Sequence, residues 1–238
     1  MPNSTSLSAS QKLAARPLTL PHVITVDGPS ASGKGTLSRR LAQDLGYVYV
    51  DTGAMYRTLA WWALKKGVRL EAPMTPADED AVVQLMRRWK AEVRVVHGQA
   101  WIHVEGYFPE KEIRGDAVEH AVPILAQIGR VRDWMVARQR DCVQFGPLVM
   151  EGRDIGTEVF PLAPVKFFIE ADESERQRRI EGRGGNTSAA RRDQMDRTRK
   201  KGALVPALDS IRINNTGQTP DETYAIMRRY VQERLESR

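Results

Sequence analysis

The chain is poor in cysteine, and it has no long apolar run. Cys142 is the single cysteine among 238 residues, so an internal disulfide framework is excluded. A lone, structural thiol is typical of a reducing compartment, and we expect a cytoplasmic protein. No apolar run approaches the ~20 residues that span a bilayer, so we expect no membrane partner. Cysteine and histidine do not cluster at metal-ligand spacing, so no directly bound metal is predicted.

Positive charge is in modest excess. The formal net charge is +6, while the charged fraction of 28% is ordinary for a globular protein. Basic residues concentrate at 130–140 and 176–201, where acidic residues accompany them. This pattern fits arginines around a phosphate pocket at least as well as a face that binds nucleic acid.

The length and the first residues suggest one compact domain behind a short leader. Residues 1–20 are rich in Ser, Thr and Ala and lack acids, and a transit peptide can look similar. We expect a disordered leader there and a single domain over 21–238.

Predicted strands and helices alternate, as in an α/β protein whose mostly parallel sheet carries helices on both faces. The predicted strands are His22–Asp27, Tyr47–Val50, Leu148–Glu151, Val165–Glu170 and Ser210–Asn214. The predicted helices are Gly35–Leu45, Gly53–Lys66, Pro76–Lys90, Asp116–Ile128, Arg130–Phe145, Glu173–Glu181, Ala189–Lys200 and Pro220–Glu236.

Two segments interrupt this alternation. Residues 92–96 and 100–104 flank a His-Gly turn and predict an antiparallel hairpin. We expect it to lie between helices, outside the central sheet, as the scaffold of a substrate flap. The glycine-rich stretch 182–188 lies among arginines and predicts a mobile lid.

A glycine-rich loop joins the first predicted strand to the first helix, which is the setting of a phosphate cradle. Its small residues let backbone N–H groups face one anion at a helix N-terminus, and Lys34 adds a full charge. The common pattern has Ser or Thr after the lysine, but here Gly35 intervenes before Thr36. The alternative is a glycine turn kept only for packing. The expected phosphate ligands are Gly28, Pro29, Ser30, Ala31, Ser32, Gly33, Lys34, Gly35 and Thr36.

A second candidate segment, Asp51–Arg57, follows the second strand. Ligands of open parallel sheets bind beyond the carboxyl ends of strands, so Thr52 and Arg57 are expected to face the crevice of the glycine loop. The alternative is a helix cap by Thr52 with Arg57 on the surface.

A third segment, Glu151–Thr157, follows the third strand and carries Arg153 and Asp154. A carboxylate there suits recognition of an exocyclic amine on a base. The alternative is a surface ion pair between these two neighbours.

A fourth segment, Arg191–Arg199, is rich in arginine. Helical spacing predicts Arg192, Asp196 and Arg199 on one face, where arginines could stabilise a transferring phosphate. The alternative is a solvated basic helix.

Together these segments resemble bacterial cytidylate kinase. The motifs GPSASGKGT, DTGAMYR, EIR, GRVR, EGRDIGTEVFP and RRDQMDRTR occur in that family's order, from about His22 to the C-terminus. The resemblance implies a P-loop NTPase-type sheet with a core at 21–60, 146–175 and 200–238. It also implies a monophosphate-binding excursion at about 61–145, which contains the hairpin, and an arginine-rich lid at about 176–199.

The resemblance also implies roles for named residues. The loop 28–36 would bind ATP, and Mg²⁺ would arrive with ATP near Thr36, with Glu151 orienting a water. The catalytic residues would be Lys34, Arg153, Arg192 and Arg199. The CMP ligands would be Thr52, Arg57, Arg132, Arg153, Asp154, Arg192 and Asp196.

The implied reaction is direct in-line transfer of a phosphoryl group from ATP to CMP or dCMP by a monomer, with no nucleic-acid partner. Two features depart from the family pattern: Pro123 stands where a serine is usual, and the lid is short. The alternatives are a small P-loop kinase for another monophosphate or metabolite such as shikimate, and a nucleotide-regulated nucleic-acid binder.

Overall fold

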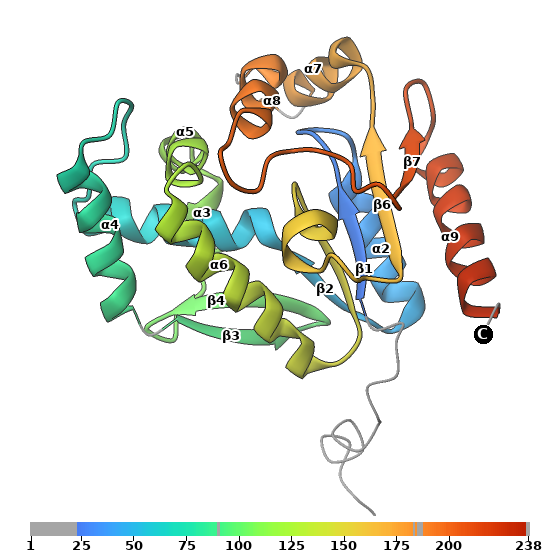
Figure 1. Cartoon of the computed structure of the whole chain (residues 1–238), viewed down its shortest axis with the longest axis horizontal. Helices are drawn as coiled ribbons and strands as arrows, with labels where there is room; N and C mark the ends of the chain where they lie inside the picture. The colour runs from blue at the N-terminus through green and yellow to red at the C-terminus, as the bar shows by residue number, and fades with distance from the viewer. Residues whose placement is uncertain (1–22, 90, 183, 185–187, 237–238) are drawn as a thin grey trace, which may run out of the picture.

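The computed structural model describes residues 23–89, 91–182, 184 and 188–236 (Figure 1). The predicted leader 1–20, His22 of the first predicted strand and most of the predicted mobile link at 182–188 lie outside the described residues.

One seven-stranded sheet organises the described residues, with strand order β3-β4-β2-β5-β1-β6-β7. Every neighbouring pair is parallel except the antiparallel β3–β4 pair. The sheet is therefore doubly wound, since the chain crosses from β1 to β2 on one side and later reaches β6 on the other. The strands are β1 Val23–Asp27, β2 Val48–Asp51, β3 Ala91–Val96, β4 Gln99–Val104, β5 Leu148–Gly152, β6 Val165–Glu170 and β7 Ile211–Asn214.

The hairpin prediction was right about the hairpin and wrong about its place. β4 pairs in parallel with β2 through Tyr49 with Gln99 and Val50 with Ala100, so the hairpin extends the central sheet. Its inner residues Ala100 and Ile102 are buried in the core shared with α3. The sequence shows the β pattern of the hairpin, but not which strand lies beside it, because pairing depends on the tertiary arrangement.

Helices follow the predicted positions, but four of them end two to four residues early. A 3-10 turn at Cys142–Phe145 follows one of these ends, and another at Glu112–Arg114 precedes the helix that begins at Asp116. A π-helical turn spans Ile155–Val159. The helices are α2 Lys34–Leu45, α3 Thr52–Lys65, α4 Pro76–Arg88, α5 Asp116–Leu125, α6 Gly129–Asp141, α7 Glu173–Glu181, α8 Ala189–Arg197 and α9 Pro220–Glu236.

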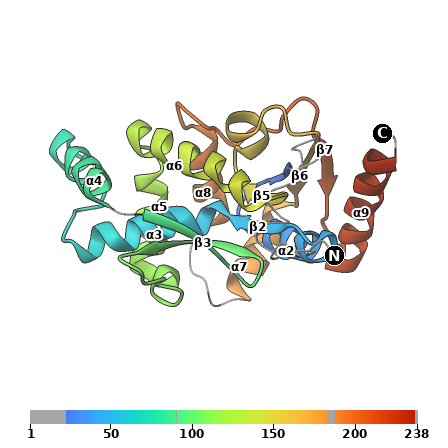
Figure 2. The same cartoon turned by 90° about the horizontal axis from the view of Figure 1, so that it is seen from below.

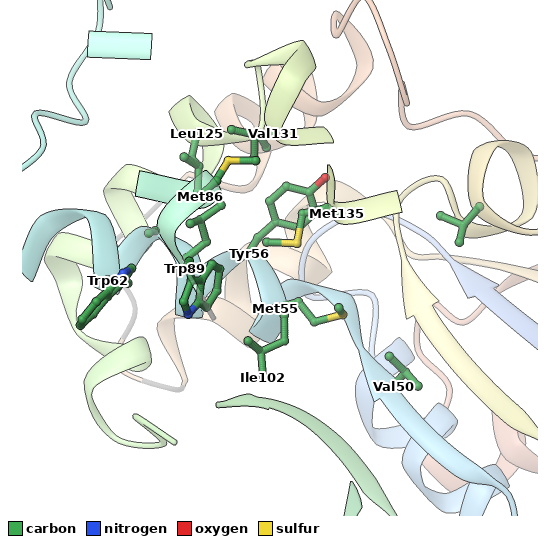
Figure 3. Close-up of a cluster of buried hydrophobic side chains, with 14 of the residues drawn as sticks. Val50, Met55, Tyr56, Trp62, Met86, Trp89, Ile102, Leu125, Val131 and Met135 are labelled. Atoms are coloured by element: carbon green, nitrogen blue, oxygen red, sulfur yellow. The ribbon is translucent and has the colours of Figure 1, made fainter. Parts of the chain in front are cut away.

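Two hydrophobic clusters cover the two faces of the sheet, because successive strand residues point to opposite faces. In β5, Leu148 and Met150 join the cluster shared with α3 and α6, whereas Val149 joins the cluster shared with α2 and α9. The first cluster extends beyond the sheet toward α4 and α5, where Trp89 and Leu125 are buried (Figure 3). Figures 1 and 2 both show α4 and α9 at opposite ends of the molecule.

The register of the sheet brings the predicted site segments together. Asp51 of β2 pairs with Glu151 of β5, and Asp27 of β1 pairs with Gly152. Three parallel strands therefore release their loops side by side at one edge of the sheet. Helices α7 and α8 lie above the end toward which the β6 arrow points (Figure 1).

Candidate active site

A cavity of about 480 Å³ lies at the carboxyl ends of β1, β2 and β5. Of the predicted site residues, Gly28, Pro29 and Ser32 do not line it, and the others do. The predicted residues along its wall are Ser30, Ala31, Gly33, Lys34, Gly35, Thr36, Thr52, Arg57, Arg132, Arg153, Asp154, Arg192, Asp196 and Arg199.

The glycine loop is shaped by close backbone approach. A Cβ at Gly28 would lie 2.1 Å from the carbonyl oxygen of Ile169, so only glycine fits there. Gly33 caps α2 with φ of +90°, a conformation that glycine adopts at little cost. The loop thus turns sharply from β1 into the N-terminus of α2, where unpaired N–H groups favour an anion.

Lys34 is folded back onto this loop. Its Nζ donates a hydrogen bond to the carbonyl oxygen of Pro29 at 2.9 Å, and the side chain is buried. Burial and the neighbouring Arg153 lower the pKa of Lys34 to about 7. An anion placed against the loop would therefore stabilise the charged ammonium.

Glu151 explains why glycine follows Lys34. A Cβ at Gly35 would lie 2.9 Å from Oε1 of Glu151, a buried carboxylate that accepts a hydrogen bond from the hydroxyl of Tyr49. Burial, reinforced by the charge of Asp51, raises the pKa of Glu151. The departure from the common loop pattern makes room for this carboxylate beside the loop.

The segment after β2 begins α3. Asp51 caps the helix by accepting a hydrogen bond from the N–H of Ala54 at 2.9 Å, so the predicted alternative of a cap by Thr52 is not what the structure shows. The hydroxyl of Thr52 instead donates a hydrogen bond to the carbonyl oxygen of Glu151, with 2.7 Å between the two oxygens. Arg57, one turn along, is half-buried and lines the cavity, as expected.

Arg132 and Asp154 form a buried ion pair in the cavity wall. Nη2 of Arg132 donates to Oδ2 of Asp154, and the two residues are only 3% and 7% exposed. The backbone of Gly202 lies against the pair, since a Cβ there would come within 1.8 Å of Nη2. Nε of Arg132 has no hydrogen-bond partner among the described residues. The pair therefore presents an unused donor and a carboxylate at one point.

Arg153 and Asp154 do not pair with each other, which contradicts the alternative of a surface pair. Arg153 donates through Nε to Asp196 of α8 at 2.7 Å and so joins the loop after β5 to the arginine-rich segment. Neighbouring residues here reach partners on two different helices, α8 for Arg153 and α6 for Asp154.

One side of the arginine-rich segment packs against the protein, with Asp196 buried and Arg192 and Arg199 half-buried, so the segment is not a fully solvated basic helix. Arg192 is bonded to Glu119 of α5, and Arg199 to Asp196. Helix α8 ends at Arg197, so the prediction of one helical face holding Arg199 was wrong, although Arg199 still reaches Asp196 from beyond the helix. The pKa of Arg192 is lowered by burial and by Arg153.

The cations of the cavity repel one another. Burial and the guanidinium groups of Arg132 and Arg153 lower the pKa of Arg199 to about 10. Burial likewise lowers the pKa of Arg153, although carboxylates surround it. The guanidinium groups destabilise one another's positive charge, and a bound anion would stabilise it. The site therefore suits a polyanionic ligand.

Sequence reasoning missed several residues of the wall. Tyr49 and Glu119 hold charged site residues through their hydrogen bonds, and Arg114 contributes a further cation. Arg114 belongs to the EIR motif, which was a usable signal. The positions of Tyr49 and Glu119 carried none, because their partners are remote in sequence. The other lining residues that were not predicted as ligands are Arg39, Asp51, Gly53, Tyr56, Val122, Pro123, Ala126, Gly152 and Ile180.

The described residues contain neither a membrane-spanning helix nor a cluster of metal-ligating side chains. No helix in this part of the chain is long and apolar enough to cross a membrane. Within the same residues, no group of three His, Cys, Asp or Glu side chains could hold a metal ion.

The sheet order, the glycine loop with its lysine and the arginines facing it define a P-loop phosphotransferase class of protein. The family model described as Cytidylate kinase matches residues 24–233. A cytidylate kinase of Geobacillus kaustophilus is 40% identical, over 89% of this chain and 97% of its own length. One of Pectobacterium carotovorum is 38% identical, over 90% and 97%. The chain belongs to the cytidylate kinase family.

Solved structures with a similar backbone include the shikimate kinase of Acinetobacter baumannii. It is 13% identical, with a TM-score of 0.44 over 96% of this chain and 98% of that one. Since this score is below 0.5, the family assignment rests on the family model and the curated relatives.

Proposed function

We propose that the protein transfers a phosphoryl group from ATP to CMP or dCMP, forming ADP and CDP or dCDP. The observation that carries this proposal is the single cavity that joins the glycine loop to the buried Arg132–Asp154 pair, with Arg153, Arg192 and Lys34 among the residues that line it. The names of the curated relatives support CMP as the acceptor.

The donor end of the cavity is the loop 28–36. Its N–H groups and the N-terminus of α2 bind the ATP phosphates, and Lys34 leaves the carbonyl of Pro29 to contact them. The same move returns the full positive charge to Lys34, because phosphate oxygens replace a neutral partner.

The acceptor monophosphate binds opposite the loop. Arg57 and Arg153 contact its oxygens as forked donors, with Thr52 beside them. Arg192 and Asp196 of α8 contact its phosphate and sugar. Each of these side chains lines the same cavity, so one substrate pose can meet all of them.

The cytosine ring is read by the buried pair. Asp154 accepts from the exocyclic amine, and Arg132 donates to the ring carbonyl. The contact between them satisfies both buried charges. Pro123 lines this end of the cavity and has no side-chain donor, so recognition rests on Arg132 and Asp154.

Transfer needs no side-chain nucleophile. An oxygen of the CMP phosphate forms the new bond to the γ-phosphorus of ATP as the bond from that phosphorus to the bridging oxygen breaks, and ADP leaves. Lys34, Arg153 and Arg192 stabilise the charge on the equatorial oxygens, and Arg199 reaches them from the lid at 176–199. Closure of the lid excludes water, which would otherwise compete as acceptor.

Magnesium fits the chemistry of the donor end. Thr36, Asp51 and Glu151 line the cavity and supply hard oxygen atoms, which suit a cation carried in on phosphates. Mg²⁺ bound with ATP neutralises phosphate charge. Thr36 would lie nearest, and Glu151 would orient a water.

The test is ADP release with a panel of acceptors: CMP, dCMP, UMP, AMP, GMP and shikimate. We expect CMP and dCMP to be used with a kcat/KM at least ~100-fold above that of the purine nucleotides and shikimate. Equal use of all acceptors would refute the proposal, and preference for another would favour a kinase for that compound. Salt-sensitive binding of RNA or DNA without ADP release would favour the nucleic-acid alternative. Light scattering at the concentration of the assay tests whether the protein is a monomer, as expected. Fractionation of cells tests the expected cytoplasmic location.

A further inference from the structure

Asp27 is a buried carboxylate that the reaction described above does not use. It is the last residue of β1 and directly precedes the glycine loop, and it is only 4% exposed. It does not line the cavity. A buried carboxylate is costly unless its oxygens accept hydrogen bonds, so its partners indicate its role.

Both oxygens of Asp27 bind the turn that follows Asp154. Oδ1 accepts a hydrogen bond from the N–H of Ile155 at 2.8 Å, and Oδ2 accepts one from the N–H of Gly156 at 2.7 Å. Two consecutive peptide planes are thus fixed by one side chain. The first of them is the plane that joins Asp154 to Ile155, so its orientation helps to set where the Asp154 carboxylate points.

The turn after Asp154 also packs closely against β1, beside its two hydrogen bonds to Asp27. A Cβ at Gly156 would lie 3.0 Å from Oγ1 of Thr25 and 3.3 Å from Oδ2 of Asp27. The turn then continues with the N–H of Glu158 bonded to the carbonyl of Asp154 at 2.8 Å. The backbone after Asp154 is therefore held on both sides, by β1 and by its own next turn.

We infer that Asp27 is a positioning residue for Asp154, setting the distance and direction of the base-reading carboxylate relative to the glycine loop. This inference rests on the proposed function. It deepens that proposal because Asp27 joins the two ends of the cavity through one residue: its backbone leads into the donor loop, while its side chain holds the acceptor loop.

The role of Asp27 needs its ionised form, in which both oxygens accept a hydrogen bond. Burial raises the pKa of Asp27 to about 7, while the two N–H groups that bind it and the ammonium of Lys34 act in the opposite direction. The carboxylate of Asp154 adds to the rise. The geometric requirement is for two acceptor oxygens, and an amide offers only one, because its nitrogen would face an N–H.

The experiment compares Asp27→Asn with the wild type in steady-state kinetics. We expect KM for CMP to rise roughly 10-fold to 100-fold, the range for a hydrogen bond to a charged group, while KM for ATP changes less than about twofold. The preference for CMP over UMP should fall in the same variant, since Asp154 would no longer be aimed at the amine.

A destabilised control separates positioning from folding. Met227→Ala removes a fully buried side chain from α9, in the cluster on the α2 face of the sheet, without touching the cavity. It should lower the thermal midpoint and leave the ratio of the two KM values unchanged. Equal rises of both KM values in Asp27→Asn, or an unchanged KM for CMP, would overturn the inference.

A measurement on the wild type covers the case in which Asp27→Asn does not fold. Amide hydrogen exchange by NMR should show the N–H groups of Ile155 and Gly156 protected, and Asp154→Asn should leave that protection intact. Rapid exchange of both amides would overturn the inference. Failure of the proposed function looks different, because the wild type itself would then release no ADP with CMP.

Discussion

The donor loop and the acceptor wall are built in opposite ways. The loop consists of nine consecutive residues whose backbone takes a positive φ at Gly28 and Gly33. The acceptor wall takes side chains from segments near 52, 132, 153 and 192, which span more than half of the described chain. The loop is a local backbone structure, whereas the wall is a network of side chains.

This difference shows where each region is sensitive. In the loop, we expect substitutions of the residues between the glycines to have small effects. Loss of Lys34, which carries the full positive charge of the loop, should have a large effect on activity. The wall depends on ion pairs such as Arg132 with Asp154 and Arg153 with Asp196. Loss of one buried partner leaves the other charge uncompensated, so effects spread through the network.

The largest expected effect comes from the donor loop. Lys34→Ala should lower kcat on the order of 10³-fold, because it removes a preorganised charge from the transferring phosphate. A coupled assay of ADP release measures this. Lys65→Ala, on the exposed face of α3, serves as the control and should change kcat less than twofold. Retention of more than a tenth of kcat in Lys34→Ala would contradict the role of Lys34.

The next effect tests the acceptor wall. Asp154→Asn should lower kcat/KM for CMP on the order of 10²-fold, since the amide cannot replace the carboxylate that pairs with Arg132 and reads the amine. KM for ATP should change little. Asp133→Asn, an exposed carboxylate paired with Lys201, is the matched control. Equal losses for ATP and CMP would remove Asp154 from base recognition.

A smaller effect is expected from the contact between Gly35 of the donor loop and Glu151 at the end of β5. Gly35→Ala would place a Cβ 2.9 Å from Glu151, so the carboxylate or the loop must shift, and we expect kcat to fall about tenfold. Gly46→Ala is the control, since no atom lies within 4 Å of its added Cβ. It should cost stability through its positive φ and leave kcat unchanged. Wild-type kcat in Gly35→Ala would show that the contact is not needed.

The smallest expected effect is a pH dependence of KM for ATP. Because the pKa of Lys34 is lowered to about 7, the ammonium form of the free protein declines as pH rises above 7. ATP binds the charged form, so KM for ATP should rise about fivefold from pH 7 to 8 while KM for CMP rises less. Lys34→Arg keeps its charge in this range, and a profile as steep in that variant would assign the titration to another group.

The sequence predicted most of the fold because its signals are local. Short apolar runs located the strands, and the loop motif located the predicted phosphate site, with Gly35 as a departure that Glu151 explains. The pairing of β4 with β2 was not predictable, because a hairpin has the same pattern wherever it joins a sheet. Arg199 was placed on a helix that ends before it, since helix ends depend on caps and packing.

The sequence by itself determined the donor loop and the order of the segments that form the acceptor wall, because a glycine loop between strand and helix needs only neighbours along the chain. The tertiary structure alone decided that Arg153 pairs with Asp196 and not with Asp154, and that Asp27 holds the turn after Asp154. These contacts cross 43 and 128 positions of sequence. The parallel register of β1 and β5 brings Asp27 to the turn after Asp154, and the position of α8 brings Asp196 to Arg153.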